Sequence, residues 1–295
     1  MVAVPPSRGR PIQVARHRSE LGAWEMVMAE PAPAVRPWVA SYCGYREETP
    51  VPMRRREVPG PVVALIIELG PPISIVHPGD AATAVQHRLG FAAGLDDTFA
   101  ITEHAGRSHG IQINFTPFGG RLFFGRPLEE LARRVVGIDD VLGAAGRALV
   151  EQLHNAPSWD HRFELLDRVI AARAAAARGV PDYLAWAWQR IADTGGGLDI
   201  GELVDELGYS HKHVIATFRR ELGLPPRLLA RIVRFDRVIR RLRAGTVQRW
   251  ADVAQDCGYY DQSHLVRDVR EFAGCTPREL LGRALPDLGG LAEER

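Results

Sequence analysis

The spacing of apolar and polar residues divides the chain into a strand-like part and a helical part. Between residues 62 and 116, short apolar stretches alternate with turn residues, as in VVALIIEL, ISIVHP, TFAITEHAG and HGIQINF. Short strands at such intervals are typical of an antiparallel sheet or a small barrel. The FTPFGG stretch at the end of this part is interpreted as a strand end and a turn. We therefore expect a strand-rich domain, cupin-like or a small barrel, over 20–125, after a flexible N-terminus at 1–19.

After Pro127 the apolar residues recur at helical intervals. The proline predicts the start of a first helix, whose apolar face consists of Leu128, Leu131, Val135 and Val136. Asp139 or Asp140 is expected to cap a second helix that runs toward residue 155, and a third helix is expected over 159–177. These connecting helices fill 126–178, and the RGVP stretch at 178–181 is interpreted as a domain junction.

The helical part that follows contains one motif twice. Residues 200–222 read IGELVDELGYSHKHVIATFRREL, in which Gly208 ends one helix and Ser210 caps the next. Residues 250–272 read WADVAQDCGYYDQSHLVRDVREF, and Gly258 and Asp261 take the same two roles. A helix, a glycine turn and a capped amphipathic helix form the helix-turn-helix plan, whose second helix enters the major groove of DNA. An α-α hairpin can imitate one copy, but two copies with matching caps favour DNA binding.

Residues 226–243 lie between the copies and predict a connecting helix of about 27 Å. Such a helix suits recognition helices that enter successive major grooves, which are about 34 Å apart. We therefore expect an α+β protein in which an all-α domain with two helix-turn-helix units occupies 179–285, followed by a C-terminal tail at 286–295. Histidines 213 and 264 precede buried positions and are expected to pack or cap.

Composition limits these expectations. Lys212 is the only lysine, so the abundance of arginine is interpreted as codon bias and not as a sign of a nucleic-acid partner. The formal net charge of +1 gives no overall argument for a nucleic-acid partner either. The charge is nevertheless concentrated, because residues 211–249 hold eleven Lys and Arg against two acids, which predicts contacts with phosphates. No apolar run is long enough for a membrane span or a secretory signal, so we expect a soluble, cytoplasmic protein without membrane contact.

No motif of enzyme chemistry is recognised. The three cysteines, at 43, 257 and 275, are widely spaced and are expected to be reduced structural thiols. The histidines at 77, 87, 104 and 109 show no metal-ligand spacing, so no metal and no cofactor are expected. Catalytic triads, paired carboxylates and phosphate-binding loops are also missing, and we expect no enzyme activity.

The stretches ELGYSHKHVIATFRRELGLPPRLL and WADVAQDCGYYDQSHLVRDVREFAGCTPREL resemble the two halves of the DNA-binding domain of the AraC/XylS family of transcription regulators. The resemblance covers about 181–285, and GYYDQSHL followed by FAGCTP is its most specific part. The fragments GIQINFTPFGGRLFFGRPLEEL, VVGIDDVLG and WDHRFELLD resemble an actinobacterial-type subgroup of the family. The resemblance implies sequence-specific activation or repression of transcription, with double-stranded DNA and RNA polymerase as partners.

The same resemblance implies roles for residues early in each recognition helix. It places base-reading side chains at Lys212, Ile215, Ala216, Gln262, Ser263, Val266 and Arg267. Contacts with DNA phosphates are expected from Ser210, His211, Arg219, Arg231 and Arg270. Arginine suits guanine, glutamine suits adenine, and aliphatic side chains suit the thymine methyl group. Thr217 and Val269 are smaller than the family's usual anchors. Because Ile215 and Ala216 leave the first helix few hydrogen-bonding readers, we expect the second helix to carry at least as much specificity as the first.

Two other interpretations stay open at the level of sequence. In one, the DNA-binding domain is fused to an enzymatic or metal-binding cupin-like domain, and in the other the protein is an architectural DNA-binding protein without sequence preference. The strand-rich domain is expected to bind a small effector, to form a homodimer, or both. The sequence names neither the effector nor the promoter.

Overall fold

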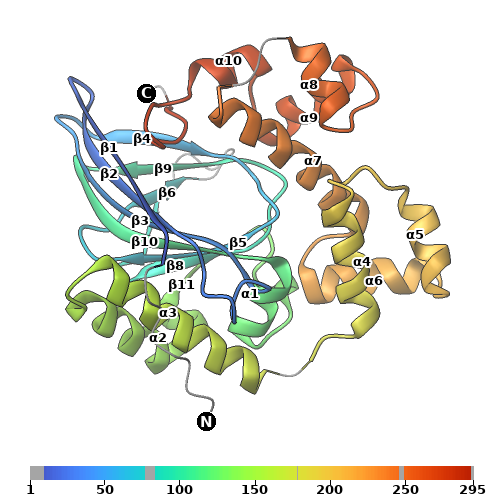
Figure 1. Ribbon diagram of the computed structural model, residues 1–295, viewed down its shortest axis with the longest axis horizontal. Coiled ribbons are helices and arrows are strands. Elements are labelled where there is room, and N and C mark those ends of the chain that lie inside the picture. Colours follow the sequence, from blue (N-terminus) through green and yellow to red (C-terminus); the bar gives the residue numbers. More distant parts are fainter. Residues whose placement is uncertain (1–9, 77–83, 178, 246–248, 294–295) are drawn as a thin grey trace.

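The structure is a computed structural model that describes residues 10–76, 84–177, 179–245 and 249–293. The N-terminal domain consists of two facing antiparallel sheets, and helices cover the outer face of the larger one (Figure 1). The larger sheet has the order β1-β2-β3-β10-β5-β8-β11 and the smaller β4-β9-β6-β7. The strands are β1 (Ile12–Ser19), β2 (Gly22–Ala29), β3 (Val39–Glu48), β4 (Met53–Glu57), β5 (Val63–Glu68), β6 (Ser74–Val76), β7 (Val85–Gln86), β8 (Gly90–Ala93), β9 (Ala100–His104), β10 (Arg107–Phe115) and β11 (Val135–Gly137).

Alternate side chains of β5 face different layers of the N-terminal domain. Leu65 and Ile67 belong to the main core, which continues into the covering helices, whereas Ile66 packs with Ile75 and Phe91 between the two sheets. The period of two therefore buries one face of the strand against helices and the other against the small sheet. The helices of this domain are α1 (Pro117–Phe124), the 3-10 helix η1 (Leu128–Glu130), α2 (Ile138–Asn155) and α3 (Trp159–Ala176).

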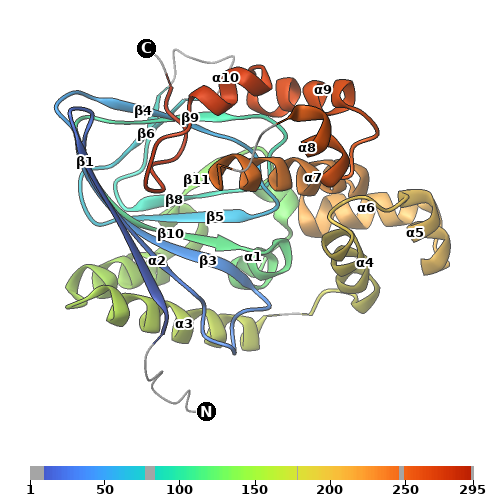
Figure 2. The same ribbon diagram turned by 45° about the horizontal axis from the view of Figure 1, so that its top comes forward.

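The C-terminal domain is helical and lies beside the open side of the two sheets (Figures 1 and 2). Its helices are α4 (Asp182–Asp193), α5 (Ile200–Leu207), α6 (His211–Leu222), α7 (Pro226–Arg243), α8 (Trp250–Asp256), α9 (Gln262–Ala273) and α10 (Pro277–Gly282). Within the described ranges, no helix has the length and apolar character that a membrane crossing requires. The expected order, a strand-rich domain before an all-α domain with two helix-turn-helix units, is confirmed.

Several local expectations were wrong. Strand β1 occupies Ile12–Ser19, inside the segment expected to be a flexible N-terminus. Val135 and Val136 form strand β11 beside β8 and do not continue a helix from Pro127. The FTPFGG stretch does not end in a turn, because Thr116 caps α1 by accepting a hydrogen bond from the backbone of Gly119 at 3.0 Å. The N-cap of α2 is Gly137, so neither aspartate caps that helix through its side chain.

Candidate nucleic-acid interface

The first helix-turn-helix unit consists of α5 and α6. Gly208 has a φ of +68°, a conformation that favours glycine, and it ends α5. The hydroxyl of Ser210 then accepts a hydrogen bond from the backbone of His213 at 3.3 Å, which satisfies a free N–H at the start of α6. Val214 and Phe218 of α6 are fully buried. The turn and the cap are those that the sequence predicts.

The second unit repeats this construction with α8 and α9. Gly258 has a φ of +80°, and the carboxylate of Asp261 accepts a hydrogen bond from the backbone of His264 at 2.8 Å. Leu265, Val269 and Phe272 are buried on the inner face of α9. Two units with a glycine of positive φ in the turn and a side-chain cap on the second helix are therefore confirmed, although the second turn is one residue longer.

Helix α7 joins the two units as a buried spacer. It begins at Pro226 and ends at Arg243, the bounds that the sequence predicts. Phe235 of α7 packs against Phe272 of α9 with ring centroids 5.3 Å apart. Because α7 also contacts α4 and α6, it links both units through one continuous helix.

The expected base-reading residues lie on the outer faces of α6 and α9. Lys212 and Ala216 are exposed and Ile215 is half-buried, one helical turn apart on α6. On α9 the reading residues meet Arg270 at a surface hollow of about 520 Å³, lined by Gln262, Ser263, Val266, Arg267 and Arg270. The structure thus brings the expected base-reading residues of the second unit together at one hollow on the surface of α9.

The expected phosphate contacts fall into two groups. Arg219 and Arg270 are exposed at the ends of the reading faces, Ser210 is the N-cap of α6, and His211 lies 3.7 Å from the Asp205 carboxylate. Arg231, in contrast, binds acidic residues of α9 and is only 23% exposed in its side chain. A phosphate contact from Arg231 stays a prediction, and it would have to compete with these ion pairs.

Part of the positive charge concentrated in residues 211–249 is engaged by ion pairs and hydrogen bonds within the protein. On α7, Arg240 pairs with Asp236, Arg241 pairs with Asp256, and Arg237 donates to the Asp256 carbonyl. Over the described part of the chain, no hydrogen bond or ion pair to protein is found for four cations of the recognition helices: Lys212, Arg219, Arg267 and Arg270. Among the described residues, these four side chains on α6 and α9 are therefore not engaged by the protein itself, and the exposed Arg227 and Arg243 of α7 share this property.

The histidines of the two units pack as expected. Nε2 of His213 lies 3.0 Å from the Tyr183 hydroxyl, and its ring stacks on Tyr209. His264 makes an edge contact with Tyr259. The sequence interpretation passed over Tyr260, which is 94% exposed next to the cap of α9. The second tyrosine of the GYYD turn is the sequence feature that could have drawn attention to Tyr260.

Among the histidines of the sheet domain, His104 belongs to a buried cluster of charged residues. Nε2 of His104 lies 3.2 Å from Glu47, which also pairs with Arg55. His77 lies outside the described residues, and among the described ones no group of three or more His, Cys, Asp or Glu is placed to hold a metal ion. The three cysteines are free thiols, and burial raises the pKa of Cys43 to about 12, so it stays protonated at neutral pH.

Comparison with known proteins assigns a domain to this geometry. Residues 203–283 match the family described as a helix-turn-helix domain, and residues 28–137 match a domain of unknown function (DUF6597). No curated protein matches the sequence. The first match and the two capped units together show a helix-turn-helix DNA-binding domain.

Several solved structures match parts of the chain at low sequence identity. An apo form of a ToxT variant from Vibrio cholerae is 10% identical with a TM-score of 0.48, and the match covers 82% of this chain and 97% of that chain. ToxT from Vibrio cholerae with a bound unsaturated fatty acid is 10% identical with a TM-score of 0.46, covering 84% and 99%. The AraC-like transcriptional activator CuxR is 14% identical with a TM-score of 0.30, covering 67% and 74%.

Proposed function

We propose that this protein is a sequence-specific DNA-binding transcription regulator of the AraC/XylS type, of an actinobacterial-type subgroup, whose helices α6 and α9 read two adjacent major grooves. The observation that carries the proposal is the pair of capped helix-turn-helix units on one spacer helix, with unpaired cations on both recognition helices. Arg219 and Arg270 are exposed at equivalent positions of the two repeats, nine residues after each cap, which supports this role over that of a plain helical bundle.

The chemistry of the reading faces supports base recognition. The guanidinium of Arg267 suits the O6 and N7 acceptors of guanine, and the amide of Gln262 suits adenine. The half-buried Ile215 and Val266 suit thymine methyl groups. Arg219 and Arg270 stand one to two turns further along each helix, where they would contact phosphates and fix the register.

The sheet domain would supply regulation in this proposal. A small effector or a partner protein would change the arrangement of the two domains and thereby recruit or block RNA polymerase in the cytoplasm. Homodimer formation through the same domain belongs to the proposal. The identity of the effector does not follow from the sheets, and the proposal names none.

Selection of bound sequences from a random DNA pool tests the proposal. The purified full-length protein is incubated with the pool at about 0.15 M salt, where non-specific binding is weakened. We expect a motif of two boxes separated by about one helical turn. Uniform retention of all sequences would instead identify an architectural DNA-binding protein, and no retention at any salt concentration would contradict the proposal.

A further inference from the structure

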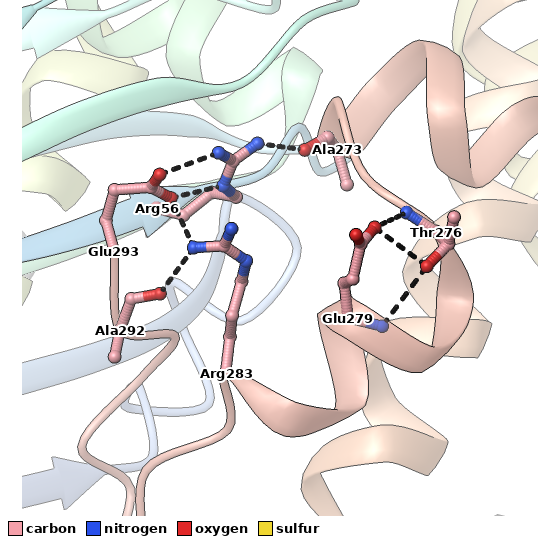
Figure 3. Close-up of polar contacts among 7 residues, drawn as sticks. All are labelled: Arg56, Ala273, Thr276, Glu279, Arg283, Ala292 and Glu293. Carbon is pink, nitrogen blue, oxygen red and sulfur yellow. Dashed lines mark hydrogen bonds and ion pairs between the residues drawn. The ribbon is translucent and has the colours of Figure 1, made fainter. Parts of the chain in front are cut away.

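Each recognition helix ends against an arginine of the sheet domain. Nε of Arg121 in α1 lies 2.7 Å from the carboxylate of Glu221, the penultimate residue of α6. Arg56 in β4 donates a hydrogen bond to the carbonyl of Ala273, the last residue of α9 (Figure 3). These two arginines come from different parts of the sheet domain, yet they take equivalent places in the two helix-turn-helix units.

The first point of attachment is closely packed. The side chains of Arg121 and Glu221 are 11% and 9% exposed. Burial acts to raise the pKa of Glu221, but hydrogen bonds from Arg121 and Arg220 hold it below the ordinary value, so the carboxylate is charged at neutral pH. Next to it, a Cβ at Gly223 would lie 3.2 Å from the carbonyl of Leu128 in η1. The end of α6 therefore rests directly on the sheet domain.

The second point of attachment, between Arg56 and the end of α9, is also closely packed. The guanidinium of Arg56 lies 3.9 Å from the centre of the Phe99 ring, and its side chain is 7% exposed. Gly274 follows α9 with a φ of +65°, and a Cβ there would lie 2.2 Å from Phe99. A cation at the C-terminus of a helix is favourable because the last carbonyls carry partial negative charge. Arg56 thus both caps α9 and fixes it to the sheet domain.

The C-terminal segment reinforces the second point (Figure 3). Nε of Arg56 lies 2.6 Å from the Glu293 carboxylate, which also accepts from Arg283 at 2.8 Å. Ala292 pairs with Arg55 as an antiparallel bridge at the free edge of β4. Leu291 is 4% exposed, and its carbonyl accepts from the backbone of Arg56 at 2.9 Å. The segment after α10 therefore returns to the sheet domain and attaches the second unit to β4.

The reading faces remain free of these contacts. Lys212 and Gln262 lie at the opposite, N-terminal ends of α6 and α9, and both are exposed. The sheet domain therefore does not cover the residues that would meet DNA. Its contacts affect the position of the two helices and leave access to them open.

We propose that Arg121 and Arg56 are positioning residues that fix the separation and angle of the two recognition helices, so that the sheet domain sets which spacing of DNA boxes the protein accepts. This inference rests on the proposed function. With both helices held, binding of the first box presents the second helix to its box at a high effective concentration. A change in the sheet domain that moves α1 relative to β4 would alter this spacing.

The test measures affinity across a series of spacings. The duplexes carry the two boxes obtained from the random pool, with one, two or five base pairs inserted or deleted between them, and one duplex carries a single box. The variants are Arg121→Gln and Arg56→Gln, and Glu293→Gln is a milder variant that removes the carboxylate paired with Arg56. Their matched controls are Arg168→Gln and Glu129→Gln, which change exposed residues of α3 and η1. Thermal unfolding of each variant confirms that it is folded.

We expect the wild type and the controls to prefer one spacing. Arg121→Gln and Arg56→Gln should each bind the optimal two-box duplex about tenfold more weakly, show a flatter spacing profile, and bind the single box as the wild type does. A wild-type spacing profile in both of these variants overturns the inference, as does an equal loss on single-box and two-box DNA. Failure of the wild type to prefer any box contradicts the proposed function itself, so the two failures are distinguishable.

Discussion

Nη2 of Arg231 in α7 lies 2.7 Å from Oδ1 of Asp268 in α9, whose side chain is 1% exposed. The same guanidinium binds Glu271 and lies over the Phe272 ring at 4.8 Å. A buried carboxylate needs such a partner, because an unpaired charge in the interior is costly. Arg231 therefore ties the spacer helix to the second recognition helix.

Replacement of Arg231 by alanine should act first on stability. Loss of the partner of a buried carboxylate costs about 3 kcal/mol, to be measured as the free energy of unfolding in urea. Arg227→Ala, at an exposed position of the same helix, is the control and should change stability little. A stable Arg231→Ala variant whose DNA affinity has a salt slope lower by about one would instead assign Arg231 to a phosphate.

Replacement of Arg267 by alanine should change specificity. Loss of a bidentate contact to guanine costs roughly 1 to 3 kcal/mol of discrimination at one base pair and leaves the stability unchanged, because the side chain is exposed. The loss of discrimination is measured as binding affinity for every single-base variant of the selected motif, with Arg168→Ala as the control. Equal losses on the motif and on random DNA would contradict the base-reading role.

The cap of α9 should be replaceable by asparagine but not by alanine. Asp261 accepts from the backbone of His264, so Asp261→Ala should lower the free energy of unfolding by about 1 kcal/mol. Asp261→Asn keeps an oxygen acceptor and should restore most of it. If both variants lose the same amount, the charge of Asp261 matters and the capping bond does not.

Glu68 should make stability depend on pH. Burial raises the pKa of this carboxyl to about 7, although the backbone of Ile73 donates a hydrogen bond to it at 3.3 Å. The folded state keeps the proton between pH 4.5 and 7 while the unfolded state releases it, so the contribution of Glu68 to stability is complete below this window and falls by about 1.4 kcal/mol per pH unit across it. In Glu68→Gln this decline should vanish from urea titrations at pH 5, 6 and 7. An unchanged pH profile would show that Glu68 titrates normally.

The predictable parts of the fold are those with local signals. Pro226 opens α7, glycines end α5 and α8, and side chains of Ser210 and Asp261 cap the next helices, so these elements follow from neighbouring residues. The capping threonine and the proline after it also marked the start of α1, but the two glycines in FTPFGG favoured a turn.

The parts that escaped prediction depend on distant partners. Val135 and Val136 become a strand because they pair with Ala93 and Ala92, more than forty positions earlier. Arg121 and Glu221 are one hundred positions apart, and neither residue is unusual in its own segment. The sequence predicted where the reading faces lie, but it could not show which arginines have protein partners.

The most direct test of paired readout crosses two reader variants with two boxes. Affinities of the wild type, Lys212→Ala and Arg267→Ala are measured on the selected duplex and on duplexes in which the first or the second box is scrambled. We predict that each substitution costs affinity only while one particular box is intact, and that the two substitutions depend on different boxes. Dependence of both substitutions on the same box, or on neither, would contradict the claim that α6 and α9 read separate grooves.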